Sequence, residues 1–423
     1  MKNFFILDPF EKISHKEQTE TLQHSTFRCT RCNACAQSCP SYHKHAEESF
    51  SPRGRVQILR LLLEGKIKYQ HNKTLIDKTV KDCILCGRCT CACAGNIPIA
   101  ELMISLRRAA NLHEISWPIR IFLHWHTTQP RLFDVMVRTV QKMRRLKLWP
   151  ICGGGFRFLQ QINTLHRLLP APKYTLRQIL AKEKLPFHEK KPSYLYLPSL
   201  EACYIDPHIG LLSLKALKGK KTHVLFGFSS GLFEYLYGKK HLSLQAAKRL
   251  LVAWEKKSSQ KPIPLVTDSI ETFYFLKKYA MLFPEKSNWQ KRAVAFSKEV
   301  RYIADFISVN GKNTCKTVLD TSALLSPSRQ AVDRTQKILK THFGKNLLEC
   351  EYSRFPMPLA GAIFTQSRTM LLENVRGIAQ RQIKQVFCLS ALASFQLNAL
   401  LNKHYPAAKA QHIVYLQEKN DRI

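Results

Sequence analysis

The chain has 423 residues, 45% of them hydrophobic, and this length allows two or three domains that each bury a core. It contains no run of about 18 apolar residues, so no membrane-spanning helix is expected. The formal net charge of +36 bears on partners and solubility and not on the fold. Nucleic acid, an anionic membrane surface or a generally basic proteome could account for it. Because the basic residues are scattered along the chain, we favour the last explanation.

The sequence begins with MKNFFILDPFEKISHK, where one lysine precedes a short apolar patch that Asp8 and Pro9 interrupt. This pattern is too weak for a secretory signal, so we expect a cytoplasmic protein. The chain has 14 cysteines. In a reducing compartment, spaced cysteines are more often metal ligands than disulfides.

Two cysteine runs follow in the first quarter of the chain. The first, CTRCNACAQSCP, lies at residues 29–40, and the second, CILCGRCTCAC, lies at residues 83–93 with the same frame. Between them, Ser51 and Pro52 are typical of a helix start, and apolar residues follow at helical spacing. The segment IPIAELMISLRRAANL after the second run is also helical in pattern. We therefore predict two cysteine loops held between helices.

The spacing C-x2-C-x2-C-x3-C in both runs is typical of [4Fe–4S] binding, and in two-cluster ferredoxins the fourth sulfur comes from the other run. Structural zinc usually uses two separated C-x2-C pairs or includes histidine, so we favour iron–sulfur clusters over zinc. The sequence predicts two [4Fe–4S] clusters with these ligands: Cys29, Cys32, Cys35 and Cys93 on the first, and Cys83, Cys86, Cys89 and Cys39 on the second.

Cys91 lies inside the second run and could replace Cys93 as a ligand. Its spacing would pull the sulfur back toward its own loop, and we interpret it as a bystander thiol. The histidines of HKHAEE at 43–48 are interpreted as surface residues, because four cysteines already suffice for each cluster. Neither run contains an obvious acid–base pair, so the pair of clusters favours electron transfer between outside partners.

A basic connector is predicted at residues 111–191. Its densest basic stretch, RTVQKMRRLKLWP at 138–150, has interleaved apolar residues and is interpreted as a docking surface for an acidic membrane face or partner. CGGGF at 152–156 is interpreted as a turn rather than a phosphate loop. The two histidines of LHWHT at 123–127 allow a quinone or lipid contact, but an ordinary amphipathic helix is the simpler interpretation.

From residue 192 onward, short apolar strands alternate with helical stretches, a pattern that predicts largely parallel sheets. The expected strands are at 193–198, 223–228, 262–267, 316–320, 346–350 and 385–390. The cycle occurs twice, which indicates a weak internal duplication. We predict an α+β multidomain chain: an α-helical ferredoxin domain at 1–110, the helical connector at 111–191, and α/β domains at 192–308 and 309–423.

Three segments, RCTRCNACAQSCPSY, SPRGRVQILRLLLEGK and CILCGRCTCACAGNIPIAELM, resemble the N-terminal half of the glycolate oxidase iron–sulfur subunit family. Its relatives include subunits of lactate utilisation, anaerobic glycerol-3-phosphate dehydrogenase and heterodisulfide reductase. The resemblance is specific over residues 27–110, because both cysteine runs and the PRGR segment occur in order. The remainder resembles two cysteine-rich CCG domains more loosely.

In that family each CCG domain carries conserved cysteine ligands, but here most of those places hold other residues. Cys203 is retained, while the other places hold Ser229, Ser230, Ser269, Thr272, Ser322, Pro356, Met357, Ser390 and Ala393. Hydroxyls, proline and alanine cannot hold a soft iron cluster as thiolates can. The CCG-like domains are thus degenerate, heterodisulfide-reductase activity is not expected, and docking of partners is the role that remains. The other cysteines are interpreted as core thiols: Cys152, Cys203, Cys315, Cys350 and Cys388.

The resemblance implies a subunit and not a complete enzyme. Electrons would come from an FAD-linked oxidase subunit acting on a 2-hydroxy acid of the glycolate or lactate type. They would leave to a quinone or another carrier, with the protein peripheral on the inner face of the cell membrane. Two alternatives are a nucleic-acid-binding iron–sulfur protein, prompted by the charge, and a divergent scaffold whose clusters only stabilise the fold. Because no recognition helix or aromatic-basic RNA motif stands out, nucleic acid is not an expected partner.

Overall fold

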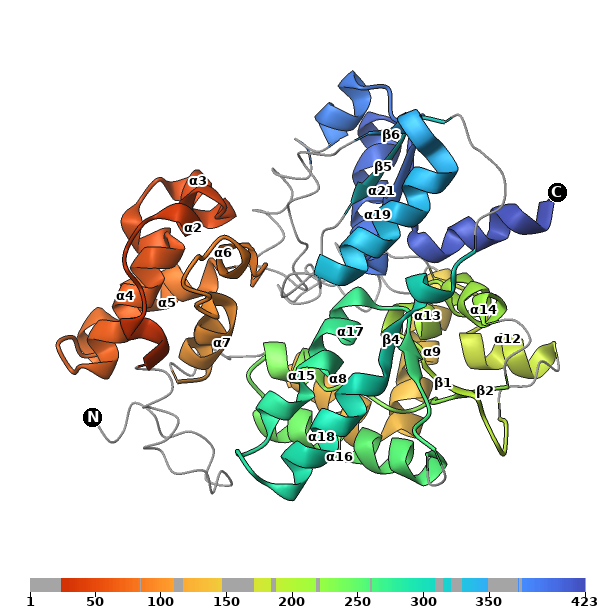
Figure 1. Ribbon diagram of the computed structural model, residues 1–423, viewed down its shortest axis with the longest axis horizontal. Helices are drawn as coiled ribbons and strands as arrows, with labels where there is room; N and C mark the ends of the chain where they lie inside the picture. The colour runs from red at the N-terminus through yellow and green to blue at the C-terminus, as the bar shows by residue number, and fades with distance from the viewer. Residues whose placement is uncertain are drawn as a thin grey trace.

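The computed structural model describes residues 24–83, 85–109, 117–146, 171–183, 188–217, 221–258, 261–308, 315–320, 329–348, 372 and 375–422. An N-terminal helical region lies to one side of two α/β regions, each built on its own sheet (Figure 1). Several features singled out in the sequence lie outside the described residues: the CGGGF turn, Cys152, Cys350, Ser322, Pro356 and Met357.

The helical region contains the short helices α2 and α6 within the cysteine runs and four longer helices around them. These are α2 (Ala34–Gln37), α3 (Pro40–His45), α4 (Pro52–Leu63), α5 (Lys73–Lys81), α6 (Arg88–Cys91) and α7 (Ile99–Ala109). Helix α4 begins as predicted: Ser51 caps it by accepting a 2.8 Å hydrogen bond from the Gly54 amide. Pro52 occupies the first turn, where its missing N–H costs nothing.

Gly54 is required by a close approach of the chain to itself. A Cβ at this position would lie 1.9 Å from the carbonyl oxygen of Glu48, in the 3₁₀ turn Glu48–Phe50. Any larger residue would therefore push α4 away from the first cysteine run. This explains the glycine of the PRGR segment.

The first sheet is parallel, with the strand order β2-β1-β3-β4. Its strands are β1 (Tyr194–Leu197), β2 (Thr222–Val224), β3 (Leu265–Thr267) and β4 (Val300–Tyr302). The helices around it are α13 (Leu200–Tyr204), α14 (Pro207–Ala216), α15 (Leu232–Leu236), α16 (Lys240–Lys257), α17 (Ile270–Lys277) and α18 (Asn288–Glu299). Leu195 and Tyr196 are both fully buried although they point to opposite faces, as expected for a parallel sheet covered on both sides.

The second sheet repeats this arrangement. Its strands are β5 (Thr317–Asp320), β6 (Leu347–Leu348), β7 (Gln385–Cys388) and β8 (Lys409–His412), in the parallel order β6-β5-β7-β8. The described helices here are α19 (Arg329–Phe343), α21 (Ala391–His404) and the 3₁₀ helix η7 (Ile413–Arg422). The identical strand order in the two sheets agrees with the predicted duplication, while the domain limits themselves stay a prediction.

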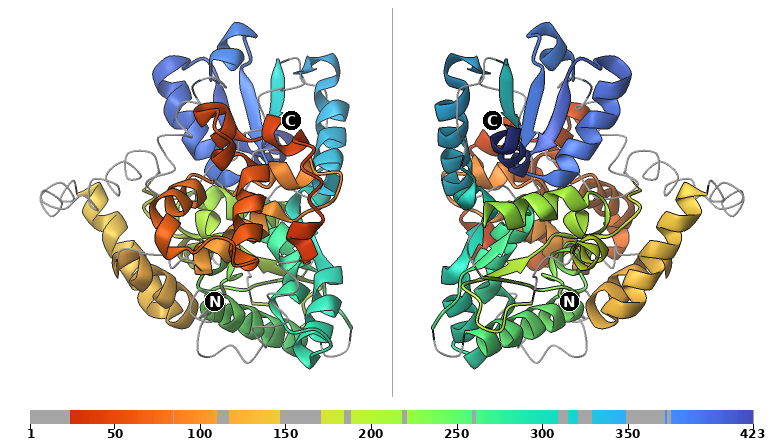
Figure 2. Two further views of the ribbon diagram at one scale, coloured as in Figure 1. Left: turned by 90° about the vertical axis from the view of Figure 1, so that its left-hand side faces the viewer. Right: turned by 90° about the vertical axis from the view of Figure 1, so that its right-hand side faces the viewer.

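The described part of the connector is helical and packs on the first α/β region. It consists of α8 (Trp117–Thr128), α9 (Pro130–Arg145) and α12 (Leu176–Lys182). Leu123 of α8 is buried against Leu242 of α16, and α9 lies at the outer edge of the molecule in the side views (Figure 2). Of the helices that the structure describes, none combines the length and apolar character needed to cross a bilayer.

Polar contacts join the three regions. Glu101 of α7 pairs with Lys278 at the end of α17, with 3.0 Å between Oε1 and Nζ. The Tyr302 hydroxyl donates to the Leu389 carbonyl at 2.9 Å and so connects the two α/β regions. One hydrophobic cluster contains buried residues from all three regions, and a separate cluster lies within the second α/β region.

Candidate functional site

The two cysteine runs adopt the same backbone turn. In the first, Arg31 and Asn33 on either side of Cys32 have φ angles of 60° and 65°; in the second, Leu85 and Gly87 have φ angles of 53° and 71°. Left-handed conformations cost a non-glycine residue about 1–2 kcal/mol and persist where the surrounding structure enforces them, often at ligand-binding loops. The matching turns show that the repeat in the sequence is also a repeat in space.

The third cysteine of each run stands on a short helix that begins directly after this turn. Helix α2 carries Cys35 and α6 carries Cys89. The prediction of plain loops between helices was therefore wrong in this detail. A single helical turn brings the third thiol back over the first two.

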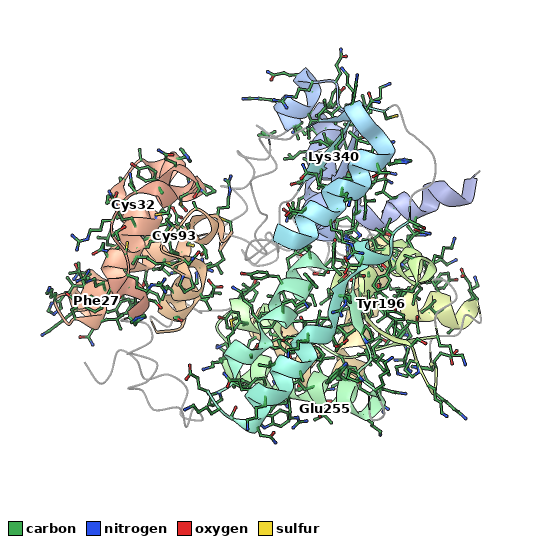
Figure 3. All side chains as sticks on the ribbon, viewed as in Figure 1. Phe27, Cys32, Cys93, Tyr196, Glu255 and Lys340 are labelled. Carbon is green, nitrogen blue, oxygen red and sulfur yellow. The ribbon has the colours of Figure 1, made fainter. Side chains whose placement is uncertain are left out.

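The structure brings the eight predicted thiols together in two adjacent groups. The first group is Cys29, Cys32, Cys35 and Cys93, and the second group is Cys39, Cys83, Cys86 and Cys89. Burial raises the pKa of Cys35 to about 11, and the neighbouring charges of Cys29, Cys93 and Cys32 contribute to the rise. Burial likewise raises the pKa of Cys86 to about 12, with contributions from Cys83 and Cys39. Cys93 thus lies among the thiols of the first run, and Cys39 among those of the second (Figure 3 labels Cys32 and Cys93).

The second group lines one cavity. Cys39, Cys83, Cys86 and Cys89 face it together with Arg55. The pKa of Cys89 is raised by burial, by the other three cysteines of this cavity and also by Cys35, so the two groups are neighbours. In the first group Cys32 is exposed, whereas Cys35 is buried.

Among the described residues, no three Cys, His, Asp or Glu side chains are placed to share a single metal ion. Four sulfurs bound to one zinc by bonds of about 2.3 Å would lie within about 4 Å of one another. A [4Fe–4S] cluster spreads its four thiolates over four iron atoms, so its ligands do not meet at a single ion.

Two arginines, the buried Arg55 and the half-buried Arg107, lie beside the second group. The Arg55 side chain is 2% exposed; its Nε donates to the Thr79 carbonyl at 2.9 Å and its Nη1 contacts the Cys39 sulfur at 3.7 Å. Its buried Nη2 has no hydrogen-bond partner. Arg107 donates to the carbonyls of Val80 and Cys83, and burial lowers its pKa. Buried cations need nearby negative charge, and four cluster thiolates would supply it, so the residues present fit the group.

Other arginines fix the first run. Arg53 donates to both carboxylate oxygens of Glu48, at 2.7 and 2.8 Å, and to the Arg31 carbonyl at 3.2 Å. Arg28 donates to the Gly95 carbonyl at 2.7 Å and so joins the two runs. In the PRGR segment, Arg53 therefore holds the first run while Arg55 reaches the thiols of the second group.

The family comparison agrees with this geometry: residues 25–97 match the 4Fe-4S dicluster domain family. The probable glycolate oxidase iron–sulfur subunit of Bacillus subtilis is 22% identical over 304 residues, which cover 66% of this chain and 64% of that protein. The chain is therefore similar to a glycolate oxidase iron–sulfur subunit.

Shorter matches cover the cysteine region. Lactate utilization protein B of an Exiguobacterium species is 39% identical over 87 residues, or 20% of this chain and 17% of that protein. The glycolate oxidase iron-sulfur subunit of Escherichia coli is 27% identical over 75 residues, or 18% of this chain and 17% of that protein. The chain thus matches less than two thirds of the length of each of these relatives. No solved structure matches it.

Four of the hydroxyl residues that replace family cysteines gather around one pocket at the carboxyl ends of β1, β2 and β3. They are Ser229, Ser230, Ser269 and Thr272, and Glu201 and Glu271 line the same pocket. Ser269 caps α17: its Oγ accepts from the Thr272 amide at 3.1 Å and donates to Glu271 at 3.0 Å. The hydroxyl of Ser269, one of these four residues, is thus engaged in hydrogen bonds that hold the start of α17.

The predictions for the remaining cysteines and histidines have mixed outcomes. Cys388 is fully buried, as expected for a core thiol. Cys203 lies on α13 and not at a strand end, and burial raises its pKa. His43 is exposed as predicted, but His45 is partly buried, stacks on Phe50 and pairs with Asp82. The side chain of Cys91 lies outside the described residues.

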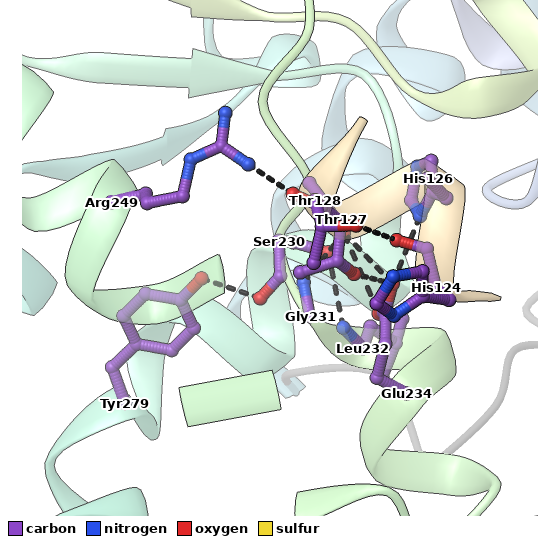
Figure 4. A network of polar contacts seen from close by, with 11 residues as sticks. His124, His126, Thr127, Thr128, Ser230, Gly231, Leu232, Glu234, Arg249 and Tyr279 are labelled. Atoms are coloured by element: carbon purple, nitrogen blue, oxygen red, sulfur yellow. Dashed lines mark hydrogen bonds and ion pairs between the residues drawn. The ribbon is translucent and has the colours of Figure 1, made fainter. Parts of the chain in front are cut away.

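Sequence reasoning missed the buried carboxylate of Glu234. This side chain is fully buried and accepts hydrogen bonds from His126 Nδ1 at 3.0 Å and Thr127 Oγ1 at 2.5 Å (Figure 4). Nearby, Arg249 donates to the Thr127 carbonyl, and the Tyr279 hydroxyl donates to the Ser230 carbonyl at 2.5 Å. An acid within the apolar run LFEYL was the available signal. Helix α8 is therefore more than an amphipathic helix, because His126 is paired with a buried acid.

Glu201→Gln tests the charge of the pocket lined by Ser229, Ser230, Ser269 and Thr272, which is called the hydroxyl pocket below. Burial, together with the charges of Glu271 and Asp268, raises the pKa of Glu201 from its ordinary value of 4.5 to about 7. Since the folded state holds the proton more tightly than the unfolded state, the wild type loses stability as pH rises from 4.5 to 7. Relative to the wild type, the variant should gain up to about 3 kcal/mol of unfolding free energy over this range. Urea unfolding at a series of pH values measures the difference, and parallel pH profiles would contradict it.

Proposed function

We propose that this chain is an electron-transfer subunit that carries two [4Fe–4S] clusters. It would accept electrons from a flavin-dependent dehydrogenase of a 2-hydroxy acid such as glycolate or lactate and pass them to a quinone or another carrier. The observation that carries the proposal is the pair of matching cysteine turns whose thiols mix into two adjacent groups. When bound, the clusters supply one-electron chemistry.

The proposed ligands are Cys29, Cys32, Cys35 and Cys93 for the first cluster and Cys83, Cys86, Cys89 and Cys39 for the second. The neighbouring charges of Cys35 and Cys89 support a short path between the two groups. Cys32 is exposed, whereas Cys86 and Cys89 are buried, and this contrast supports the first group as the one closer to a docked redox partner.

The proposed partner on the donor side is an FAD-linked oxidase subunit, because relatives of this chain are named as iron–sulfur subunits of glycolate oxidase. On the acceptor side, α9 supports a position at the inner face of a membrane. Its exposed surface includes Leu132 and Val135, and Leu146 follows at its end, at 50%, 59% and 57% exposure. Lys142 and Arg145 lie in its last turn. Apolar and basic residues together suit an anionic bilayer surface.

Anaerobic purification tests the cluster count and the relay together. We expect about eight iron and eight sulfide per chain, and an EPR signal after reduction by an FAD-linked 2-hydroxyacid dehydrogenase subunit with its substrate. Zinc in place of iron, or about four irons, would contradict the cluster assignment. Eight irons that dithionite reduces but the flavoprotein does not would leave the clusters in place and refute the relay.

A further inference from the structure

A second cavity, of about 230 Å³, lies beside the hydroxyl pocket. Pro198 and Leu200, which follow β1, line it together with Gly227 and Phe228, which follow β2. Open parallel sheets commonly bind ligands beyond the carboxyl ends of their strands. The cavity is smaller than the pockets of drug-sized ligands, about 300–1,000 Å³, and therefore suits a small molecule.

Three arginines from three helices line this cavity. They are Arg131 of α9, Arg177 of α12 and Arg249 of α16. The cavity is also lined by Asp134, whose carboxylate is already paired with Arg138. Many arginines are expected in a chain with a net charge of +36, but three that line one cavity from separate helices are not.

Arg249 is held in place at the cavity wall. Its Nη1 donates to the Thr127 carbonyl, and its guanidinium lies over the Phe228 ring, 5.9 Å from the ring centroid. A cation that is fixed before binding loses little side-chain freedom when an anion arrives. Arg131 and Arg177 are exposed and can reach an anion from the rim.

His126 adds an oriented imidazole to the same wall. Its Nδ1 lies 3.0 Å from Glu234 Oε1, which leaves Nε2 as the ring nitrogen available to the cavity (Figure 4). Burial acts to raise the pKa of Glu234, but the hydrogen bond and charge of His126 and the bond from Thr127 outweigh it, so the pKa lies below its ordinary value. The ionised Glu234 therefore holds the His126 ring in a fixed orientation.

We propose that this cavity binds a small anion with a carboxylate or phosphate group, whose oxygens pair with Arg131, Arg177 and Arg249 and with His126. Guanidinium groups match both oxyanions through parallel hydrogen bonds. The site is separate from the cysteine groups, so a test of anion binding does not depend on the electron-transfer proposal.

Isothermal titration of the full chain at low ionic strength with inorganic phosphate, and separately with oxalate, tests the site. At least one anion should bind to the wild type, and Arg131→Gln/Arg177→Gln should weaken that binding at least tenfold. Both side chains are exposed, so the melting temperature of the double variant without anion should stay unchanged. Arg249→Lys keeps the charge but loses the planar fork, and it should also weaken binding.

The matched control is Lys337→Gln/Lys340→Gln on α19, which removes two exposed charges beside the second sheet (Figure 3 labels Lys340). This control should bind as the wild type does. If neither anion binds, or if both double variants lose affinity equally, the site does not exist. The second result would mean that any bound anion only screens the overall charge.

Discussion

Cys39→Ser is expected to abolish the EPR signal of one cluster and leave the other, with the iron content falling from about eight to about four per chain. Cys39 belongs to the first run by sequence, but its thiol lines the cavity of Cys83, Cys86 and Cys89. A serine hydroxyl is a poor ligand for iron in a sulfide cluster. Cys93→Ser should have the reciprocal effect and remove the signal that Cys39→Ser retains. EPR of the reduced proteins, with iron and sulfide analysis, measures both.

Cys91→Ser provides the control, because the change is chemically identical and lies in the same run. It should leave both signals intact. Loss of a signal in this variant, together with retention in Cys93→Ser, would show that the fourth ligand of the first cluster was assigned to the wrong residue. In the proposed assignment each run supplies the fourth ligand of the other run's cluster. If Cys39→Ser and Cys93→Ser removed the same signal, this assignment would be refuted.

Arg55→Met should shift the midpoint potential of one cluster to a more negative value by roughly 60–120 mV. A unit charge about 6–10 Å away in an effective dielectric of about 20 contributes roughly 1.5–3 kcal/mol, and 59 mV corresponds to a tenfold change for one electron. Without the cation, and without the N–H that contacts the Cys39 sulfur, the additional electron on the cluster is less stable. An EPR-monitored redox titration measures the shift.

Two further variants isolate the cause. Arg55→Lys keeps the charge but not the fork that also reaches Thr79, so its shift should be smaller than that of Arg55→Met. Arg60→Met removes a cation from the same helix, but Arg60 pairs with Glu64 and faces no thiol cavity, so both potentials should remain unchanged. Equal shifts in Arg55→Met and Arg60→Met would attribute the effect to overall charge and not to the contact with Cys39.

The sequence predicted well those parts of the fold that a short local pattern specifies, such as cysteine spacing, a helix-capping residue or a run of apolar residues. The cysteine frame gave the eight candidate ligands, and Ser51 with Pro52 gave the start of α4. The inner strands β1, β3, β5 and β7 were found because their residues are apolar on both faces, as burial in a covered parallel sheet requires.

The missed strands were β4 and β8, and edge position alone does not explain this, because the edge strands β2 and β6 were predicted. Both lie at an edge of their sheets, and each is only three or four residues long. The sequence KAQH of β8 alternates polar and small residues, and two of its four side chains are buried. A short edge strand needs less apolar surface than an inner one, so hydrophobic pattern alone did not identify it.

The buried charged side chains could not be predicted from local sequence pattern, for a different reason. Arg55 is explained by the Thr79 carbonyl and the Cys39 sulfur, and Glu234 is explained by His126. These partners are far apart in sequence, and only the folded chain places them in contact. Likewise, the replacement of four family cysteines could be recognised from the resemblance, but the neighbouring cavity with its three arginines could not.

The mixing of thiols between the two runs has a consequence for biogenesis. If each centre takes three sulfurs from one run and one from the other, the ribosome exposes no complete binding set until Cys89 has emerged, and the set that includes the first three cysteines is complete only with Cys93. The Arg28–Gly95 hydrogen bond, which ties the two runs together, also forms only at that point. Insertion of either cluster must then wait until both runs have left the ribosome, so the first run cannot be loaded with its own four cysteines as soon as it is made.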